Sequence, residues 1–260
     1  MATIRFKKLI HSLIGDYFYN EIRFHKIIFD YNFGKRYEIV RILPNLINEG
    51  DYCFDIGANI GQYTLPLSKL VGKLGKVFSF EPVIENYYYL KKMIKKKNLK
   101  NVKAFNIALS DRTGTDKIFI PRIGKLKMGT RAFLSNIKVG LKYNDIVKEK
   151  IYVKTIDNIV KEMEIDALQL LKCDAEGSEL KILKGGYNTI RTHKPILILE
   201  INYENKGLDE LYNFGYEPFY AIKNKLMGAR TSNSKKMSLI LIHKEKNIFF
   251  KTSFVLSVSS

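Results

Sequence analysis

Tyr52-Cys-Phe-Asp-Ile-Gly-Ala-Asn-Ile-Gly-Gln62 is the stretch that decides the fold of this chain. Its first half, residues 52–56, is apolar and rich in β-forming residues, and it runs into a turn with glycines at positions 57 and 61. An amphipathic segment over residues 63–71 follows at once. The pattern predicts a strand, a tight turn and a helix. We expect Gly57 to take a backbone conformation that a Cβ would forbid, and Gly61 to let the backbone approach a ligand and the next element.

Two carboxylates stand next to this turn in the expected fold. Asp55 precedes the turn, and a second apolar run, residues 76–80, ends in Glu81. A glycine turn at one strand end and an acid at the next is typical of a nucleotide site, where the acid accepts both ribose hydroxyls. Dinucleotide sites usually read G-x-G-x-x-G, and Asn59 replaces the second glycine, which disfavours a pyrophosphate without excluding it. Glycine turns between strand and helix also occur without a ligand.

The rest of the chain alternates strand-like and helix-like segments, which predicts the α/β class. We expect helices over residues 36–46, 84–97 and 208–214, with Asp157 as the N-cap of another. We expect further strands over residues 102–109, 117–123, 151–156, 167–173, 195–201, 215–221 and 237–242. The last two are expected to form a hairpin, because residues 223–236 are too polar and short for a confident crossover helix.

Two blocks of sequence resemble a known family. Phe54-Asp-Ile-Gly-Ala-Asn-Ile-Gly61 resembles motif I of class I S-adenosylmethionine-dependent methyltransferases, most closely that of the FkbM family. Lys172-Cys-Asp-Ala-Glu-Gly-Ser-Glu179, followed by Leu183-Lys-Gly185, resembles the second diagnostic block of that family. The resemblance spans roughly residues 36–222 and is weak between 112 and 150. It implies S-adenosyl-L-methionine as cofactor and a doubly wound, mostly parallel seven-stranded Rossmann-like sheet with an antiparallel last strand.

The pattern and the resemblance together predict the site residues. In a doubly wound sheet the ends of the first and fourth strands face each other across the ligand crevice. The predicted cofactor-binding residues are Asp55, Gly57, Asn59, Gly61, Glu81, Ala108, Ser110 and Asp111, the last three because the family's adenine lies beside that strand end. An ordinary polar turn at Asp111 is the alternative there. The predicted catalytic residues are Asp174, Glu176 and Glu179.

A hydroxyl acceptor must lose a proton, and carboxylates can take it. Asp174 or Glu176 is our first choice as the base, ahead of Glu200 and His193. Paired carboxylates could instead hold a divalent cation, but no second cluster with metal-ligand spacing is present, so we predict no metal site.

The absence of one sequence motif limits which kind of atom can accept the methyl group. The sequence Asp/Asn-Pro-Pro-Tyr/Phe, with which many methyltransferases clamp a planar amino group, is replaced by Asp174-Ala-Glu-Gly177. This favours oxygen over a nucleobase nitrogen. The resemblance implies an O-methyltransferase acting on a hydroxyl of a sugar, glycan or glycolipid. Three alternatives remain: a nucleic-acid methyltransferase, a dinucleotide-dependent oxidoreductase and a non-catalytic nucleotide-binding module. The absence of an RNP aromatic pattern disfavours the first of them.

The amino-acid composition indicates which classes of partner the chain could bind. The chain has 260 residues with Lys+Arg 44 against Asp+Glu 26, a net charge of +18. This charge implies attraction to nucleic acid, anionic lipid or acidic glycan. Lysine is abundant throughout the chain, however, so much of the charge reflects general composition and does not mark a binding site. Cys53 and Cys173 lie in apolar runs and suit a reducing cytoplasm, where we expect the protein, with the inner face of the membrane as an alternative. No oligomeric state is predicted.

We expect one domain with two appendages. Residues 36–244 form the methyltransferase-like domain, with residues 112–154 as an insert or lid and Arg131 as an expected anion-binding residue. Residues 245–260 form a tail, and residues 1–35 an N-terminal extension in which residues 18–34 are irregular and line a substrate entrance. Its amphipathic helix, residues 6–17, is too short and charged to span a bilayer. We expect it to pack on the domain, with an anionic membrane surface as the alternative.

Overall fold

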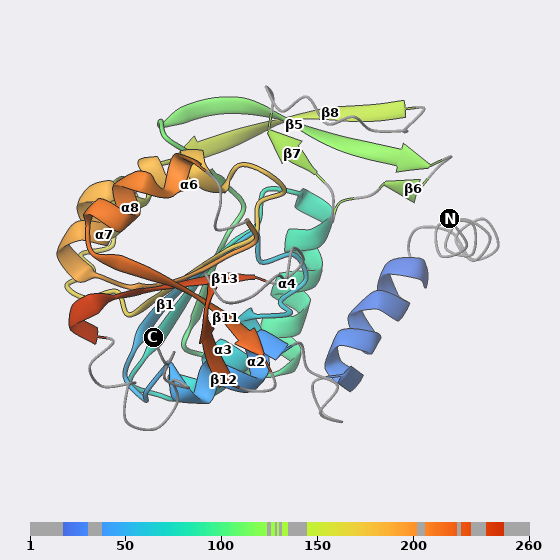
Figure 1. Ribbon diagram of the computed structural model, residues 1–260. Helices are drawn as coiled ribbons and strands as arrows, with labels where there is room; N and C mark the ends of the chain where they lie inside the picture. Colours follow the sequence, from blue (N-terminus) through green and yellow to red (C-terminus); the bar gives the residue numbers. More distant parts are fainter. Residues whose placement is uncertain are drawn as a thin grey trace.

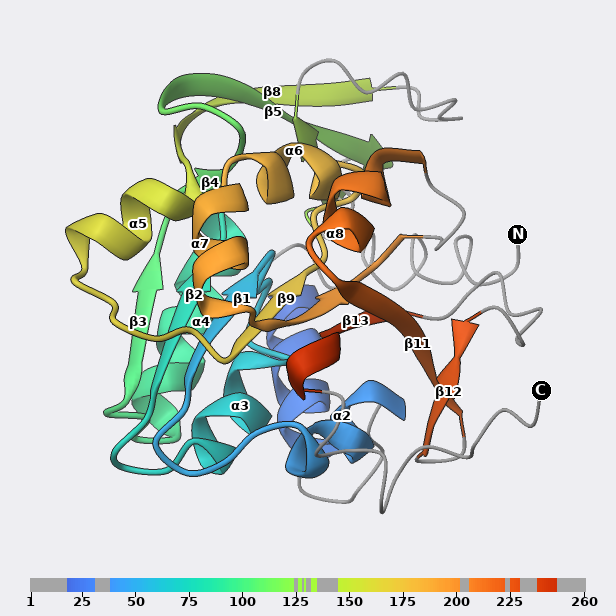
Figure 2. The same ribbon diagram turned by 60° about the vertical axis from the view of Figure 1, so that its left-hand side comes forward.

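The computed structural model describes residues 18–30, 38–123, 126–127, 129, 132–134, 145–201, 206–222, 225–229 and 238–246. In this part of the chain a large α/β sheet carries helices on both faces, and a smaller β-sheet lies over one end of it (Figure 1, Figure 2). The predicted helix over residues 6–17, Arg131 and the tail after residue 246 lie outside the described residues.

The large sheet has the strand order β12-β11-β13-β10-β9-β1-β2-β3. The strands are β1 (Tyr52–Ile56), β2 (Lys76–Phe80), β3 (Val102–Phe105), β9 (Leu170–Cys173), β10 (Ile196–Leu199), β11 (Tyr216–Ile222), β12 (Lys225–Gly228) and β13 (Leu239–His243). The five strands from β10 to β3 in this order are parallel, while β13 runs antiparallel to β10 and β11. The doubly wound sheet with an antiparallel last strand in the chain is therefore confirmed.

The predicted number of seven strands is wrong for this sheet, which has eight strands among the described residues. The additional strand is β12, which pairs antiparallel with β11 in a stretch that we expected to be a loop because it is polar. Leu226 in β12 and Ala229 after it are buried. Two apolar side chains are enough to bury this segment against the sheet, and a count of polar residues does not reveal them.

Two apolar cores cover the two faces of the sheet. One face packs against α2 (Glu38–Ile42), η1 (Leu43–Asn45) and α3 (Thr64–Leu70). The other packs against α5 (Ile156–Glu162), α6 (Glu179–Lys184), α7 (Tyr187–His193), η3 (Lys206–Leu208) and α8 (Asp209–Asn213). Because both faces are covered, the parallel strands are buried on both sides and read as continuous apolar runs. This is why strands β1, β2 and β9 were recognisable from sequence.

The smaller sheet is built mainly from the segment that we expected to be an insert or lid. Its order is β4-β8-β5-β6, and β7 pairs with β5. The strands are β4 (Ala108–Leu109), β5 (Gly114–Ile123), β6 (Leu126–Lys127), β7 (Phe133–Leu134) and β8 (Asp145–Lys154). The predicted single strand over 102–109 is wrong, because the chain leaves the large sheet after β3 and pairs β4 with β8. The strand predicted at 151–156 is the end of the longer β8.

Two local predictions need correction. Residues 18–30 form a helix rather than an irregular segment, and it lies beside α4 (Ile84–Lys96), as Figure 1 shows. Phe24 and Ile28 bury one side of this helix. The N-cap of α5 is Thr155, whose hydroxyl accepts from the N–H of Asn158, and not Asp157. Asp157 instead accepts hydrogen bonds from the N–H and hydroxyl of Thr189.

Candidate functional site

The glycine turn after β1 is held in the expected strained form. Gly57 has φ +72°, and a Cβ there would lie 1.9 Å from the backbone oxygen of Asp174. Both the positive φ and the lack of space for a Cβ therefore require glycine at this position. Asn59 has φ +52°, in the left-handed region that asparagine tolerates better than most residues. Gly61 has φ +97°, and a Cβ there would lie 2.1 Å from Cε of Met93 in α4. Gly61 therefore allows close packing of the turn on α4.

Glu81 ends β2 and is almost completely buried, with 4% of its surface exposed. Its Oε2 accepts a hydrogen bond from the N–H of Asn59 at 2.7 Å, and its Oε1 accepts from the N–H of Val83 at 2.9 Å. Burial raises the pKa of Glu81 to about 7, although these two N–H donors oppose the rise. The turn after β1 and the acid after β2 are thus joined directly, as the sequence pattern predicts.

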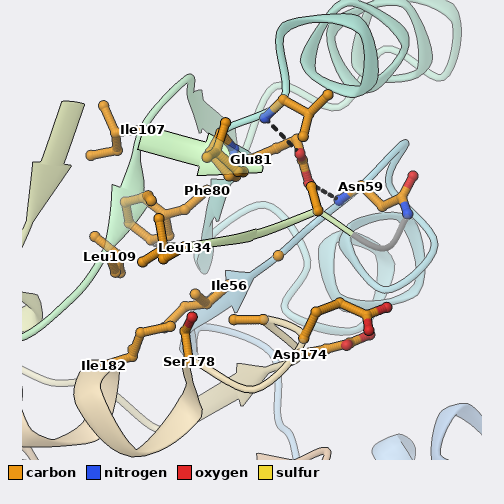
Figure 3. Close-up of a pocket in the computed structure, with 18 of the residues that line it drawn as sticks. Ile56, Asn59, Phe80, Glu81, Ile107, Leu109, Leu134, Asp174, Ser178 and Ile182 are labelled. Atoms are coloured by element: carbon orange, nitrogen blue, oxygen red, sulfur yellow. Dashed lines mark hydrogen bonds between the residues drawn. The ribbon is translucent and has the colours of Figure 1, made fainter. Parts of the chain in front are cut away.

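A pocket opens between these strand ends, with an empty volume of about 610 Å³ when the part open to solvent is included. Of the predicted site residues, Gly57, Asn59, Glu81, Ala108, Asp174 and Glu176 line it. Figure 3 shows Glu81 and Asn59 on one side of the pocket and Asp174 on another. The ends of β1, β2 and β9 therefore meet in one cavity.

One half of the pocket is apolar, and sequence reasoning missed most of it. The additional lining side chains are Ile56, Phe80, Val83, Ile107, Leu109, Ile118, Ala132, Leu134 and Ile182. Ile118 and Leu134 come from β5 and β7, which pair with each other at this point, so the smaller sheet supplies part of the wall. An apolar wall beside a buried carboxylate suits a ligand with an apolar ring and neighbouring hydroxyl groups. A signal for Ile118 was present in the alternation along β5.

Four residues predicted to bind the cofactor do not line the pocket. Asp55 is fully buried beneath the turn, where its Oδ2 accepts from the hydroxyl of Thr64 at 2.6 Å. Gly61 faces α4 instead. Ser110 and Asp111 are not part of the lining, and the Ser110 hydroxyl donates a hydrogen bond to the Asp111 carboxylate at 3.2 Å. For Asp111 this local bonding matches the alternative of an ordinary polar turn, because β4 turns away to join the smaller sheet.

The predicted catalytic residue Glu179 is also absent from the lining. It is 2% exposed at the start of α6, where a carboxylate is favoured by the helix dipole. Its Oε1 accepts hydrogen bonds from the N–H of Ala175 at 2.7 Å and from that of Gly177 at 3.2 Å. Glu179 therefore fixes the loop that follows β9. This geometry favours a structural role for it, with Asp174 and Glu176 left to face the pocket.

In an extended chain Asp174 and Glu176 would lie on the same face, but the chain is not extended here. β9 ends at Cys173, and Glu176 has φ +47° with Gly177 at φ +94°. A glutamate in the left-handed region is uncommon, and such strain is concentrated at functional sites. Asn59 is the other non-glycine residue of the described pocket lining with positive φ, so both loops that flank the pocket carry a strained residue.

Lys172 is the main charged residue that sequence reasoning left without a role. It is 3% exposed, and its Nζ lies 3.5 Å from Oδ1 of Asp55 and 3.6 Å from Oδ2 of Asp174. It also lies 4.7 Å from the ring centre of Tyr63. Burial alone lowers the pKa of Lys172, but the carboxylates of Asp55 and Asp174 raise it above the ordinary value overall. A buried cation therefore joins the carboxylates at the ends of β1 and β9.

Glu200 and Arg23 complete the surroundings. Glu200 follows β10, and partial burial and the neighbouring Asp174 carboxylate raise its pKa. Arg23, from the helix over 18–30, donates a hydrogen bond from its Nη2 to the side-chain oxygen of Asn59 at 3.2 Å. His193 ends α7 and precedes β10, so it lies at the opposite edge of the sheet and is not near the pocket. Among the described residues, no group of three or more His, Cys, Asp or Glu side chains is arranged to hold a metal ion.

Both cysteines are buried and free, as their apolar sequence surroundings predict. Burial raises the pKa of Cys53 and of Cys173 well above the ordinary value. Neither thiol is therefore suited to act as a nucleophile.

Comparison with known proteins gives the chain a family. The family model described as the methyltransferase FkbM domain matches residues 55–218. No curated protein shows significant similarity to the chain. One similar solved structure is methyltransferase FkbM from Methylobacillus flagellatus KT, with 19% identity and a TM-score of 0.49. The match covers 74% of this chain but only 43% of that one, so the chain spans less than half of that protein's length.

Two further structures are similar at a lower level. An rRNA methylase from Streptococcus thermophilus has 10% identity and a TM-score of 0.44, covering 79% of this chain and 93% of that one. Aeropyrum pernix fibrillarin, solved with natively bound S-adenosyl-L-methionine, has 10% identity and a TM-score of 0.44, covering 78% and 73%. At TM-scores below 0.5 these similarities carry no information on the acceptor.

Proposed function

Because this chain belongs to the FkbM methyltransferase family, and is thus an S-adenosylmethionine-dependent methyltransferase, we propose that it methylates a hydroxyl oxygen of a sugar, glycan or glycolipid. The observation that carries the proposal is the carboxylate of Asp174 beside the buried cation of Lys172, at the end of β9. An amino-group clamp would need the aromatic ring that Asp174-Ala-Glu-Gly177 lacks, whereas a carboxylate suits the removal of a hydroxyl proton.

The residues of the pocket fit S-adenosylmethionine. Glu81 is a buried carboxylate in a largely apolar cavity. It accepts hydrogen bonds from the N–H groups of Asn59 and Val83 and, at 3.3 Å, from the side-chain amide of Asn86, and ribose hydroxyls would complete its acceptor capacity. Ile107 and Leu109 line the apolar half, which suits the adenine ring. The bound cofactor would supply an electrophilic methyl group. The pocket residues would hold it in place, since methyl transfer depends mainly on alignment, worth up to ~7–11 kcal/mol.

The acceptor side would be organised by Asp174 and its neighbours. The side chain of Asp174 is 29% exposed, so it can meet an acceptor and still be balanced by the ammonium of Lys172 behind it. Glu179 holds the loop that carries Glu176 toward the pocket. In this arrangement the Asp174 carboxylate takes the hydroxyl proton as the acceptor oxygen is methylated. Glu176 or Glu200 would then bind other hydroxyls of the same acceptor.

The cofactor assignment is tested by calorimetric titration with S-adenosylhomocysteine and, separately, with NAD. We expect S-adenosylhomocysteine alone to bind, and Glu81→Ala to weaken its binding by about a hundredfold through two lost charge-assisted hydrogen bonds. Glu85→Ala is the matched control, because Glu85 lies one turn away on α4 and pairs with Lys127 instead. Binding of NAD, or equal effects of the two substitutions, would contradict the assignment.

The acceptor assignment needs a separate experiment. The protein is incubated with S-adenosylmethionine labelled in its methyl group and with glycan, glycolipid or RNA fractions. We expect label in alkali-stable methyl ethers of sugars, and loss of transfer in Asp174→Asn with S-adenosylhomocysteine binding retained. Asp166→Asn is the matched control, since Asp166 precedes the same strand at its other end. Label found only in RNA would favour a nucleic-acid methyltransferase and overturn the proposal.

A further inference from the structure

Arg23 links the helix over residues 18–30 to the glycine turn. Its Nη2 donates a hydrogen bond to the side-chain oxygen of Asn59 at 3.2 Å, and its Nη1 donates to that of Asn20, one turn earlier on the helix, at 2.9 Å. The guanidinium is thus held by one oxygen of its own helix and by one oxygen of a residue that lines the pocket. Arg23 precedes the family match over residues 55–218, so the family pattern gives it no role.

Asn59 connects Arg23 with the carboxylate of Glu81. Its N–H donates to Oε2 of Glu81 at 2.7 Å, and Figure 3 shows its side chain directed away from that carboxylate. With φ at +52°, Asn59 depends on its surroundings to hold this uncommon backbone conformation. A hydrogen bond that fixes its side chain therefore helps to keep its N–H directed at Glu81.

The helix has other contacts that hold it on the domain. No helix among the described residues is long and apolar enough to cross a membrane, and this one packs on the turn and on α4. Apolar residues of the helix and of the turn are buried in one cluster, which includes Phe24, Ile28, Ala58 and Ile60. The ammonium of Lys92 in α4 also pairs with the carboxylate of Glu21. Attachment of the helix therefore does not explain why Arg23 reaches Asn59.

Arg23 also brings a positive charge to the cofactor side of the pocket. Burial lowers the pKa of Arg23, although Tyr19 and Glu81 oppose the change. The guanidinium remains protonated, because its pKa starts far above neutral. Placing a cation where it is partly buried costs free energy unless its donors and its charge are used. Here the donors bond to Asn20 and Asn59, and the charge favours the ionised carboxylate of Glu81.

We propose that Arg23 is a positioning residue for the cofactor, which acts through Asn59 on the ribose site at Glu81. The ribose hydroxyls would meet Glu81 in the geometry that the N–H of Asn59 fixes. Loss of the guanidinium would loosen this geometry without removing a direct contact with the cofactor. The helix over residues 18–30 is then part of the cofactor site. The inference rests on the cofactor placement proposed above and not on the identity of the acceptor.

A double-mutant cycle tests whether Arg23 acts through Asn59. Asn59→Gly removes the side chain, keeps the N–H and takes a positive φ without strain. We expect Arg23→Gln to weaken the binding of S-adenosylhomocysteine, measured by calorimetry, by about five- to tenfold in the wild-type background. In the Asn59→Gly background the same substitution should weaken it by less than about twofold. Lys26→Gln is the matched control, because Lys26 pairs with Asp30 of the same helix and should change binding by less than about twofold.

The pH dependence of binding gives a second readout, which loss of helix packing alone would not move. The groups that act on Glu81 come from the helix, the glycine turn, the start of α4 and β9, and they are Arg23, Asn59, Val83, Asn86 and Lys172. Glu85 of α4 acts on Arg23 in turn. A cation favours the ionised carboxylate, so removing the guanidinium raises the pKa of Glu81. In Arg23→Gln the affinity should therefore begin to fall about half a pH unit higher than in the wild type, and Lys26→Gln should follow the wild type.

Three results would overturn the proposal. The first is an Arg23→Gln affinity within about twofold of the wild type, and the second is equal weakening by Arg23→Gln in both backgrounds. The third is an unmoved pH dependence together with a lower free energy of unfolding in urea, which would mean that Arg23 only holds the helix in place. Wild-type binding of S-adenosylhomocysteine and its loss in Glu81→Ala test the cofactor placement separately, so failure of this cycle would leave that placement standing.

Discussion

The two sides of the pocket hold their carboxylates in opposite ways. On the β1–β2 side, Glu81 is fixed by neutral donors, the N–H groups of Asn59 and Val83 at 2.7 and 2.9 Å. On the β9 side, Asp174 is balanced by the cation of Lys172 at 3.6 Å, beyond the usual hydrogen-bond length. Directional donors preorganise a site for one neutral group. A cation without a short hydrogen bond balances charge and leaves the carboxylate able to meet an acceptor.

Lys172→Met removes the cation from the β9 side and should have the largest effect on the free energy of unfolding. It leaves the buried carboxylate of Asp55 without its cation, which costs about 3–5 kcal/mol when one partner of a buried pair is removed. Urea unfolding measures the free energy of unfolding. Lys161→Met, at an exposed position of α5, is the control and should change it by less than about 0.5 kcal/mol. Equal losses in the two variants would mean that the Lys172 cation is not what holds β1 and β9 together.

Gly57→Ala tests whether the two sides must touch. A Cβ at position 57 would overlap the backbone oxygen of Asp174, so the ends of β1 and β9 would separate. Gly50→Ala is a matched control, because Gly50 also has positive φ, +94°, but has nothing within 4 Å of the added atom. We expect Gly57→Ala to be less stable than Gly50→Ala by about 1–3 kcal/mol, the usual effect of overpacking. Thermal and urea unfolding of both variants give this difference.

The pH dependence of cofactor binding sharpens the comparison on the Glu81 side. Burial raises the pKa of Glu81 to about 7, and the ionised carboxylate is the better acceptor for two hydroxyls. As the pH falls below 7 the carboxylate takes up a proton, so the affinity for S-adenosylhomocysteine should fall by up to about tenfold per pH unit. Calorimetry from about pH 5 to about pH 8 measures it.

Glu81→Gln is the control for this titration, because it cannot ionise. Its affinity should be lower at neutral pH and nearly independent of pH. A wild-type affinity that is flat over the same range would show that Glu81 stays ionised in the free protein, contrary to the direction given by its burial.

Glu200→Gln should have the smallest effect and probes the charge on the acceptor side. Partial burial and the Asp174 carboxylate raise the pKa of Glu200, so its negative charge is less favourable in the folded protein than in the unfolded chain. Removing the charge should stabilise the fold by less than about 1 kcal/mol, because much of the Glu200 surface is accessible to solvent even though its carboxylate is partly buried, and solvent screens the charge. The gain should shrink in high salt, which urea unfolding at two salt concentrations shows. Destabilisation would indicate that Glu200 is bound by a cation instead.

The cofactor side could be predicted from sequence because its signals are local. A strand, a glycine turn and an acid after the next strand lie within thirty residues, and the parallel register pairs Asp55 with Ser79, so the two strand ends must meet. The predicted site residues Gly57, Asn59 and Glu81 line the pocket for this reason. Their functional roles remain predictions.

The five predicted site residues that do not line the pocket share one physical feature. Their side chains or Cα atoms bond locally or pack on another element; these residues are Asp55, Gly61, Ser110, Asp111 and Glu179. Which side of a turn faces a cavity depends on dihedral angles and neighbours, and residue spacing does not encode either. The left-handed conformation of Glu176, for example, is a dihedral angle that the spacing of residues does not predict.

Sequence alone therefore determined the α/β class, the central strands and the two chemical blocks, since these follow from periodicity and from the glycine and acid positions. Tertiary structure decided what closes the pocket and what balances its charge. Ile118 and Leu134 reach it only because β5 and β7 pair, and Lys172 contacts Asp55 only because β9 lies beside β1. Contacts between segments more than a hundred residues apart, such as β1 and β9, depend on strand register and long-range burial, which local patterns leave open.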